Sequence, residues 1–281
     1  IEFAEQFQRG MTGIERFLQI VDADIEIFDE PDAVELKDPK GEISFEKVSF
    51  EYPDDHNKVF TNLNLQIHAG EKVAIVGPSG GGKTTLCNLI PRFYDVSEGK
   101  ILLDGQDITD WSITDRARAG VSFAFQQPVR FKGVTVKDLI TLASGKDIST
   151  AAACDYLAQV GLCAKDYIDR EVNASLSGGE LKRIEIATVM ARKTKLTLFD
   201  EPEAGIDLWS FKNLIDVFEK MHDEIQASIM IISHQERILN IADQVVVISN
   251  GEIAQIGTKE EVLPGLFGID PGCRYFQGGN E

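Results

Sequence analysis

The sequence lacks a hydrophobic run long enough to cross a membrane. No apolar stretch approaches the roughly 18 to 20 residues that a spanning helix needs. The N-terminus also has no basic stretch followed by an apolar one, the pattern of a secretory signal. We therefore expect a chain that is neither inserted in a membrane nor secreted, and that works in the cytoplasm, in solution or at the inner face of the membrane.

Positive charge is scarce as well. The 281 residues hold 28 Lys and Arg against 46 Asp and Glu, for a formal net charge of -18. Proteins that bind the phosphate backbone of nucleic acids usually carry a basic face. The composition therefore argues against a nucleic-acid partner.

Cysteines are few, and their spacing does not indicate a metal site. Cys87, Cys154, Cys163 and Cys273 form no C-x-x-C pair. A chain of this length does not depend on disulfides for a stable core. We expect four reduced thiols, most of them packed in the interior.

What the sequence does contain is an alternation of strand and helix patterns, which predicts an α/β fold. Residues 42–52 and 59–68 alternate like half-buried strands of an antiparallel sheet. Residues 72–76, KVAIV, form a short apolar run typical of a central parallel strand. Asn250-Gly251, between two further strand-like runs, predicts a tight hairpin.

The patterns divide the chain into three parts. Residues 1–40 are predicted to form an amphipathic helix and an acidic linker. Residues 41–267 are predicted to form the main domain, and a mainly helical subdomain is inserted in it at about 128–192. Residues 268–281 are predicted to be a loose tail.

A glycine-rich loop, GPSGGGKT at 77–84, lies between the 72–76 strand and a helix pattern, the context of a phosphate-binding loop. Its backbone N–H groups are predicted to cradle the β-phosphate of a nucleotide. Lys83 would bridge the β- and γ-phosphates and Thr84 would bind Mg2+. The predicted nucleotide-binding residues here are Gly77, Pro78, Ser79, Gly80, Gly81, Gly82, Lys83, Thr84 and Thr85.

Two carboxylates end another apolar strand pattern, KLTLFDE at 195–201. Strand ends are where ligands sit in parallel α/β sheets. Asp200 is predicted to hold Mg2+ through water, and Glu201 to polarise the water that attacks the γ-phosphate.

A second glycine turn, LSGGE at 176–180, begins another helix pattern. Ser177 and the N–H groups of Gly178 and Gly179 would stand at the positive end of that helix, which favours an anion. From Gly41 to about Leu266, the motifs together resemble those of the ATP-binding cassette (ABC) ATPases. LSGGE resembles the family's signature sequence, with Glu180 where glutamine is usual.

This resemblance implies a P-loop NTPase core with a mixed, mainly parallel sheet, an antiparallel β subdomain and the inserted helical subdomain. It also implies an ATP-dependent homodimer. In the family two cassettes pair head to tail, and each signature closes over the γ-phosphate of the ATP that the other chain's lysine loop holds.

The resemblance assigns roles to further residues. Tyr52 resembles the aromatic residue that stacks on adenine, although a strand tyrosine packed in the sheet is the alternative. Gln126 resembles the glutamine that reaches Mg2+ and the attacking water, with Gln127 as the neighbouring alternative. Asp207 resembles the residue that signals across the dimer, and His234 the switch histidine that bonds the γ-phosphate. The predicted catalytic residues are Lys83, Gln126, Glu201 and His234.

The subfamily that the motifs resemble changes near residues 105–110. Residues 1–108 resemble the nucleotide-binding domain of an ABC exporter, whereas residues 108–266 resemble soluble cassettes of the iron-sulfur cluster assembly type. We therefore hypothesise a chimera of two subfamilies. The partner would dock on the helical subdomain, and would be either an assembly scaffold or the coupling helices of a membrane domain.

The sequence thus predicts an ATP hydrolase that binds ATP and Mg2+ and performs conformational work on a partner protein. One alternative is the detached nucleotide-binding domain of a membrane exporter. Another is an ATP-responsive dimerising module with negligible hydrolysis. The sequence leaves open whether Glu180 points towards the opposing nucleotide or into the helical subdomain.

Overall fold

The computed structural model describes residues 11, 14, 39–53 and 57–268, without the side chains of residues 208–210, 267 and 268. The expected N-terminal helix and acidic linker lie almost entirely outside these residues, as do Cys273 and nearly all of the expected tail. Within the described part, no helix is long and apolar enough to cross a membrane.

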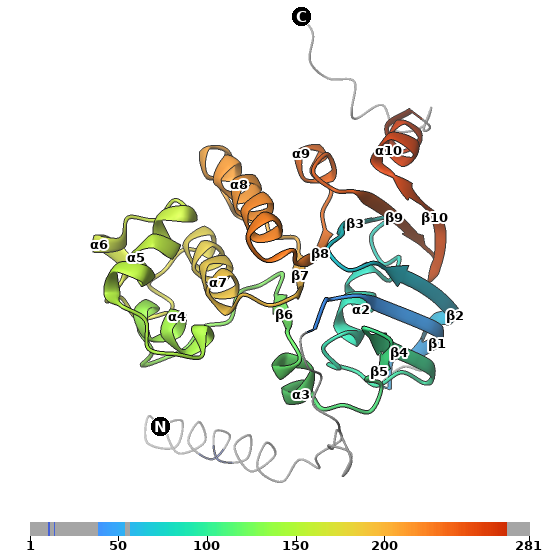
Figure 1. Cartoon of the computed structure of the whole chain (residues 1–281), viewed down its shortest axis with the longest axis horizontal. Coiled ribbons are helices and arrows are strands. Elements are labelled where there is room, and N and C mark those ends of the chain that lie inside the picture. Colours follow the sequence, from blue (N-terminus) through green and yellow to red (C-terminus); the bar gives the residue numbers. More distant parts are fainter. Residues whose placement is uncertain (1–10, 12–13, 15–38, 54–56, 269–281) are drawn as a thin grey trace, which may run out of the picture.

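Two sheets carry the fold (Figure 1). The smaller sheet has the strand order β2-β1-β4-β5 and is antiparallel. Its strands are β1 (Ile43–Glu51), β2 (Lys58–Ile67), β4 (Glu98–Leu103) and β5 (Gln106–Asp107). In β1 the apolar residues are buried and the polar residues between them are partly or fully exposed, so one face of this sheet packs on the core. The predicted antiparallel pairing of the first two strands is confirmed.

The larger sheet has the order β10-β9-β3-β8-β7-β6. Its strands are β3 (Lys72–Val76), β6 (Val121–Ala124), β7 (Leu196–Asp200), β8 (Ser228–Ile232), β9 (Gln244–Ser249) and β10 (Glu252–Thr258). All neighbours pair in parallel except β10, which is antiparallel to β9. β7 and β8 are buried along their whole length, as strands covered on both faces must be. The predicted central position of β3 is confirmed.

The predicted hairpin at Asn250-Gly251 is also confirmed. Both residues have positive φ, 51° and 74°, which is the backbone of a tight two-residue turn. A Cβ atom added to Gly251 would lie 1.7 Å from the Val59 carbonyl oxygen, so β2 passes too close for any side chain here.

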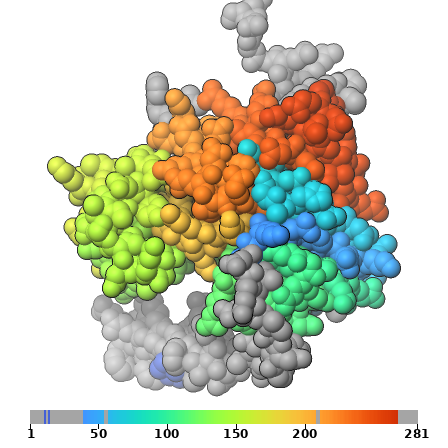
Figure 2. Space-filling model, in the orientation of Figure 1, coloured from blue at the N-terminus to red at the C-terminus, as the bar shows by residue number. Residues whose placement is uncertain are grey.

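The helices fall into two groups (Figure 1). Those beside the sheets are α2 (Lys83–Leu89), α3 (Ile113–Arg118), α8 (Leu208–Ile225), α9 (Glu236–Leu239) and α10 (Lys259–Gly268). The others form a helical lobe between β6 and β7, made of α4 (Val136–Ser144), α5 (Thr150–Gln159), α6 (Ala164–Tyr167) and α7 (Gly178–Arg192). Because β6 and β7 are neighbours in the sheet, the lobe is an insertion in the α/β core, and Figure 2 shows it as a yellow-green bulge on one side. The predicted fold class is confirmed.

Two large clusters of buried side chains form the core. One joins the antiparallel sheet, α2 and one face of the parallel sheet. The other joins the helical lobe, α8 and the second face of β7 and β8. Among the described cysteines, Cys87 is buried and Cys154 partly buried, but Cys163 is exposed. The expectation that most of the thiols are packed thus has one exception among the described residues, Cys163, which is the N-cap residue of α6.

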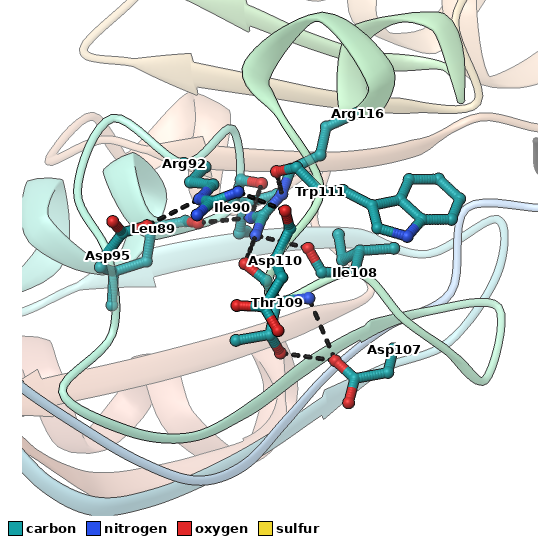
Figure 3. A network of polar contacts seen from close by, with 10 residues as sticks. All are labelled: Leu89, Ile90, Arg92, Asp95, Asp107, Ile108, Thr109, Asp110, Trp111 and Arg116. Carbon is teal, nitrogen blue, oxygen red and sulfur yellow. Dashed lines mark hydrogen bonds and ion pairs between the residues drawn. The ribbon is translucent and has the colours of Figure 1, made fainter. Parts of the chain in front are cut away.

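A buried arginine holds the end of α2, the helix that follows the glycine-rich loop (Figure 3). Arg116 is 1% exposed, and its guanidinium donates to five backbone carbonyls, those of Leu89, Ile90, Ile108, Thr109 and Trp111. The carbonyls of Leu89 and Ile90 lie at the negative end of α2, where a cation is favourable. Burial, and then the charge of Arg92, lower the pKa of Arg116 to about 9.

We predict that Arg116→Met lowers the free energy of unfolding by about 3 kcal/mol, because it leaves several buried carbonyls without a donor. Urea unfolding would measure the loss. Arg118→Met is the matched control: it lies on the same helix, its side chain is 76% exposed, and the expected change is below about 0.5 kcal/mol. Equal losses in the two variants would contradict this account of Arg116.

Candidate functional site

The glycine-rich loop connects β3 to α2 at the carboxyl end of the parallel sheet. Pro78, Ser79 and Gly80 are exposed, whereas Gly81 and Gly82 are buried. Gly77 has φ 148°, and a Cβ atom there would lie 1.9 Å from the Ile248 carbonyl oxygen, so only glycine fits. Any larger residue would push the loop away from β9.

Lys83, the first residue of α2, folds back onto this loop. Its Nζ atom donates to the carbonyl oxygens of Gly77 and Pro78, each at 2.9 Å. Burial lowers the pKa of Lys83, and the charges of Glu201 and Asp200 oppose that shift. The ammonium therefore lies inside the loop, in the field of two carboxylates.

Asp200 ends β7 and lies 3% exposed opposite the same helix. Its Oδ1 accepts a hydrogen bond of 3.5 Å from the Thr84 hydroxyl. Burial raises the pKa of Asp200, the Thr84 bond lowers it, and the charge of Glu201 raises it further. A hydroxyl and a carboxylate are hard oxygen donors, the ligand type that Mg2+ prefers. The pair predicted to hold Mg2+ is thus brought together and fits that ion chemically.

Glu201 follows Asp200 and has a positive φ of 44°. Such a backbone is strained for a residue with a side chain, and strain of this kind clusters at functional sites. The Glu201 carboxylate accepts a 2.7 Å hydrogen bond from the Gln126 Nε2 atom. Of the two neighbouring glutamines weighed from the sequence, Gln126 is therefore the one that reaches Glu201.

His234 lies just beyond β8 and is exposed. Its backbone N–H bonds the carboxylate of Glu203, which also accepts from the Ser233 hydroxyl at 2.5 Å. Burial raises the pKa of Glu203. This carboxylate therefore links the segment after Glu201 to the segment that carries His234.

The second glycine turn begins α7, with Ser177 as its N-cap. A Cβ atom added to Gly179 would lie 2.4 Å from the Gly205 carbonyl oxygen, whereas one on Gly178 would meet nothing. The turn thus packs closely on the segment that leads to Asp207, an exposed residue directly before α8.

Glu180 points back into the helical lobe. Its carboxylate accepts from the Ser177 N–H at 2.6 Å and from the Tyr167 hydroxyl, and lies 3.9 Å from Arg170. The bond from Tyr167, and then those from Ser177, lower the pKa of Glu180 to about 2. Of the two orientations left open by the sequence, the structure has the one in which the side chain points into the helical lobe.

Tyr52 lies beside the glycine-rich loop. Its hydroxyl is 2.8 Å from the Thr85 hydroxyl, and its ring packs edge-on against Phe50 and Tyr94. The ring is half-buried, so part of it can still meet a base.

The two glycine turns do not come together within one chain. Figure 1 shows α2 beside the antiparallel sheet and α7 in the helical lobe. Because Lys83 and Ser177 begin these two helices, they belong to different parts of the molecule.

Two residues near the site were not predicted from the sequence. Lys182 is fully buried on α7, and its Nζ lies 3.4 Å from Glu185 Oε2. Lys182 lies on the same helix face as Ile186, four positions later, so the sequence itself places a lysine on an apolar face of this helix. A charged residue on an otherwise buried face indicates a specific partner.

An apolar groove of about 180 Å3 opens between the parallel sheet and the helical lobe. Phe125, Val129 and Phe131 line it and are 36%, 46% and 40% exposed. Phe125 immediately precedes Gln126, so the groove adjoins the Gln126–Glu201 contact.

With this geometry established, comparison with known proteins gives the class. The family described as ABC transporter matches residues 60–204. An uncharacterized ABC transporter ATP-binding protein of Methanocaldococcus jannaschii is 37% identical over 215 residues, covering 74% of this chain and 86% of that protein. The chain belongs to the ABC transporter family and comprises its ATP-binding cassette.

Longer relatives include a flippase and an exporter. An ATP-dependent lipid A-core flippase of Syntrophus aciditrophicus is 36% identical over 264 residues, which are 91% of this chain and 43% of the flippase. A solved bacterial Atm1-family ABC exporter with ATP bound superposes with a TM-score of 0.75 at 28% identity, covering 93% of this chain and 47% of that one. The chain thus spans less than half the length of these two relatives.

These matches bear on the hypothesis of a chimera. The flippase match covers 91% of the chain, so it includes residues on both sides of 105–110. One relative therefore accounts for both halves, and the comparisons do not support a fusion of two subfamilies.

Proposed function

We propose that the chain hydrolyses ATP with Mg2+ in a head-to-tail homodimer, and that the resulting opening and closing moves a membrane-domain partner of the exporter type. The hydrogen bond between Gln126 and Glu201, beside the Thr84–Asp200 pair, carries this proposal. It places an orienting amide and a carboxylate next to a candidate Mg2+ site, behind a phosphate-binding loop.

The residues of one chain divide the chemistry among them. Lys83 exchanges the carbonyl oxygens of Gly77 and Pro78 for the β- and γ-phosphate oxygens. Glu201, oriented by Gln126, accepts a hydrogen bond from the attacking water, and His234 donates to the γ-phosphate. Thr84 and Asp200 would hold Mg2+, which would supply positive charge that offsets the phosphate charge.

A second copy completes the site. Its Ser177 and the first turn of its α7 face the γ-phosphate and direct the positive end of a helix at it. Glu180 belongs to the same first turn, where its carboxylate accepts hydrogen bonds from the Tyr167 hydroxyl and the Ser177 N–H. Asp207, on the segment in contact with Gly179, lies at the contact between copies.

The partner docks in the apolar groove lined by Phe125, Val129 and Phe131. A protein–protein anchor is favoured where aromatic side chains line an exposed hollow. Since the lipid A-core flippase and the Atm1-family structure are exporters, a helix of a membrane domain fits better than an assembly scaffold. The cassette would then work at the cytoplasmic face of a membrane.

We predict that Glu201→Gln lowers the single-turnover rate of ATP hydrolysis by about 100-fold or more, because the water loses its hydrogen-bond acceptor. ATP binding, measured separately by equilibrium titration, should remain within a few-fold of the wild type. Rapid quench with radiolabelled ATP would follow release of phosphate.

Lys83→Ala is the control for this measurement, since it should lose ATP binding as well as hydrolysis. If the wild-type chain retains ATP for hours without releasing phosphate, the protein is an ATP-responsive binding module, and the hydrolase proposal fails.

We further predict that Phe131→Asp abolishes capture of the chain by the membrane domain of the Syntrophus aciditrophicus flippase, because it places a charge in the apolar groove. Leu142→Asp is the matched control: Leu142 is 72% exposed on α4 but does not line the groove, so capture should persist. Capture by an iron-sulfur assembly scaffold, and not by this membrane domain, would contradict the exporter assignment.

A further inference from the structure

A buried ion pair lies on α7, in the turns that follow Ser177. Lys182 has a fully buried side chain, and that of Glu185 is 14% exposed. The Lys182 Nζ and Glu185 Oε2 atoms are 3.4 Å apart. Burial lowers the pKa of Lys182 and raises that of Glu185, so the environment opposes both charges.

Both side chains of the pair form hydrogen bonds with the main chain of a single residue, Phe125. Glu185 Oε1 accepts a 3.0 Å hydrogen bond from the Phe125 N–H, and Lys182 Nζ donates to the Phe125 carbonyl. Lys182 also donates to the Asp200 carbonyl at 3.3 Å. Both polar groups of the Phe125 peptide, and the end of β7, are therefore held from α7.

Phe125 needs these partners because of its place in the sheet. β6 ends at Ala124, so the next residue leaves the ladder of backbone hydrogen bonds. Its side chain stacks on Phe93, with ring centroids 5.5 Å apart, and makes a T-shaped contact with Phe123, with ring centroids 4.9 Å apart. Gln126, the following residue, is the one that contacts Glu201.

Packing alone does not require a charged pair here. Lys182 shares its helix face with Ile186, and an apolar side chain of similar volume could fill the same space. Replacing a buried ion pair by apolar residues is often neutral or stabilising. The two charges are therefore explained better by the backbone groups of Phe125 and Asp200 that they bind than by a contribution to the stability of the fold.

We propose that Lys182 and Glu185 are positioning residues which, through the main chain of Phe125, set Gln126 against Glu201 and so set the rate of hydrolysis. This inference rests on the proposed function. It also implies that any shift of the signature helix α7 is transmitted directly to Gln126.

The test is the double variant Lys182→Met/Glu185→Leu, which removes both charges together and so avoids an unpaired buried ion. We expect kcat for ATP to fall by about tenfold or more, since a small misplacement of a catalytic group is costly. KM should change by less than about threefold. Thermal unfolding should show a cooperatively folded protein with some loss of stability, because the Phe125 N–H and carbonyl lose their side-chain partners.

A second readout does not depend on activity. In the double variant, hydrogen exchange of the Phe125 amide should accelerate, because its acceptor is gone. Lys182→Met/Glu185→Gln restores an uncharged acceptor at that amide, and should regain part of the protection and part of kcat. This second variant also allows the inference to be tested if Lys182→Met/Glu185→Leu folds poorly.

The matched control is Lys220→Met/Glu224→Leu. This pair lies on α8 and also has an N···O distance of 3.4 Å, but its side chains are 43% and 52% exposed. Its kcat and its Phe125 exchange should equal those of the wild type.

A wild-type kcat in Lys182→Met/Glu185→Leu would overturn the inference, whether or not exchange at Phe125 changes. So would an equal fall in kcat in the α8 control. If the wild type itself does not hydrolyse ATP, the proposed function fails instead. Unchanged exchange at Phe125 would then overturn the positioning role on its own.

Discussion

The parallel pairing of β6 with β7 is the constraint on which the site depends. In this register Ala124 lies opposite Phe199. Gln126 and Glu201 each lie two residues beyond that pair, so the two side chains lie beside each other at the carboxyl ends of the strands. β8 pairs on the other side of β7, with Ile232 opposite Asp200, and delivers His234 to the same edge. A slip in either register would separate these groups.

The same pairing explains why the helical lobe can influence the chemistry. The chain leaves the sheet after β6 and returns to it at β7, and α7 is the last element of that excursion. The apolar groove, the start of the signature helix and the Gln126–Glu201 contact therefore meet within a short stretch of structure. A partner in the groove and a second copy at Ser177 would both act on groups next to the site.

Local sequence patterns predicted a large part of the fold. KVAIV followed by GPSGGGKT predicted the strand, loop and helix around Lys83, and Asn250-Gly251 predicted the β9–β10 hairpin. These predictions succeeded because each structure is encoded within a few neighbouring residues. The assignment of roles to Tyr52, Gln126, Asp207 and His234 came from resemblance to a family, and their roles remain proposals.

What the sequence could not supply depends on contacts between distant segments. Arg116 and Arg118 are alike within one short helix, yet one is buried under α2 and the other is exposed. The direction of Glu180 depends on Tyr167 in another helix. Lys182 has a buried partner set only because the segment after β6 passes along α7. The partners in these contacts belong to other segments of the chain, so local patterns do not identify them, even where a lysine on an apolar helix face is visible in the sequence.

The central claim is that one ATP is shared between Lys83 of one copy and Ser177 of another. Light scattering on a sizing column would test it most directly, through the mass of the Glu201→Gln variant with and without Mg-ATP. The account predicts a monomer without nucleotide and a dimer with it, and no dimer when Lys83→Ala is added. A monomer under both conditions, with ATP binding shown separately, would contradict the shared site.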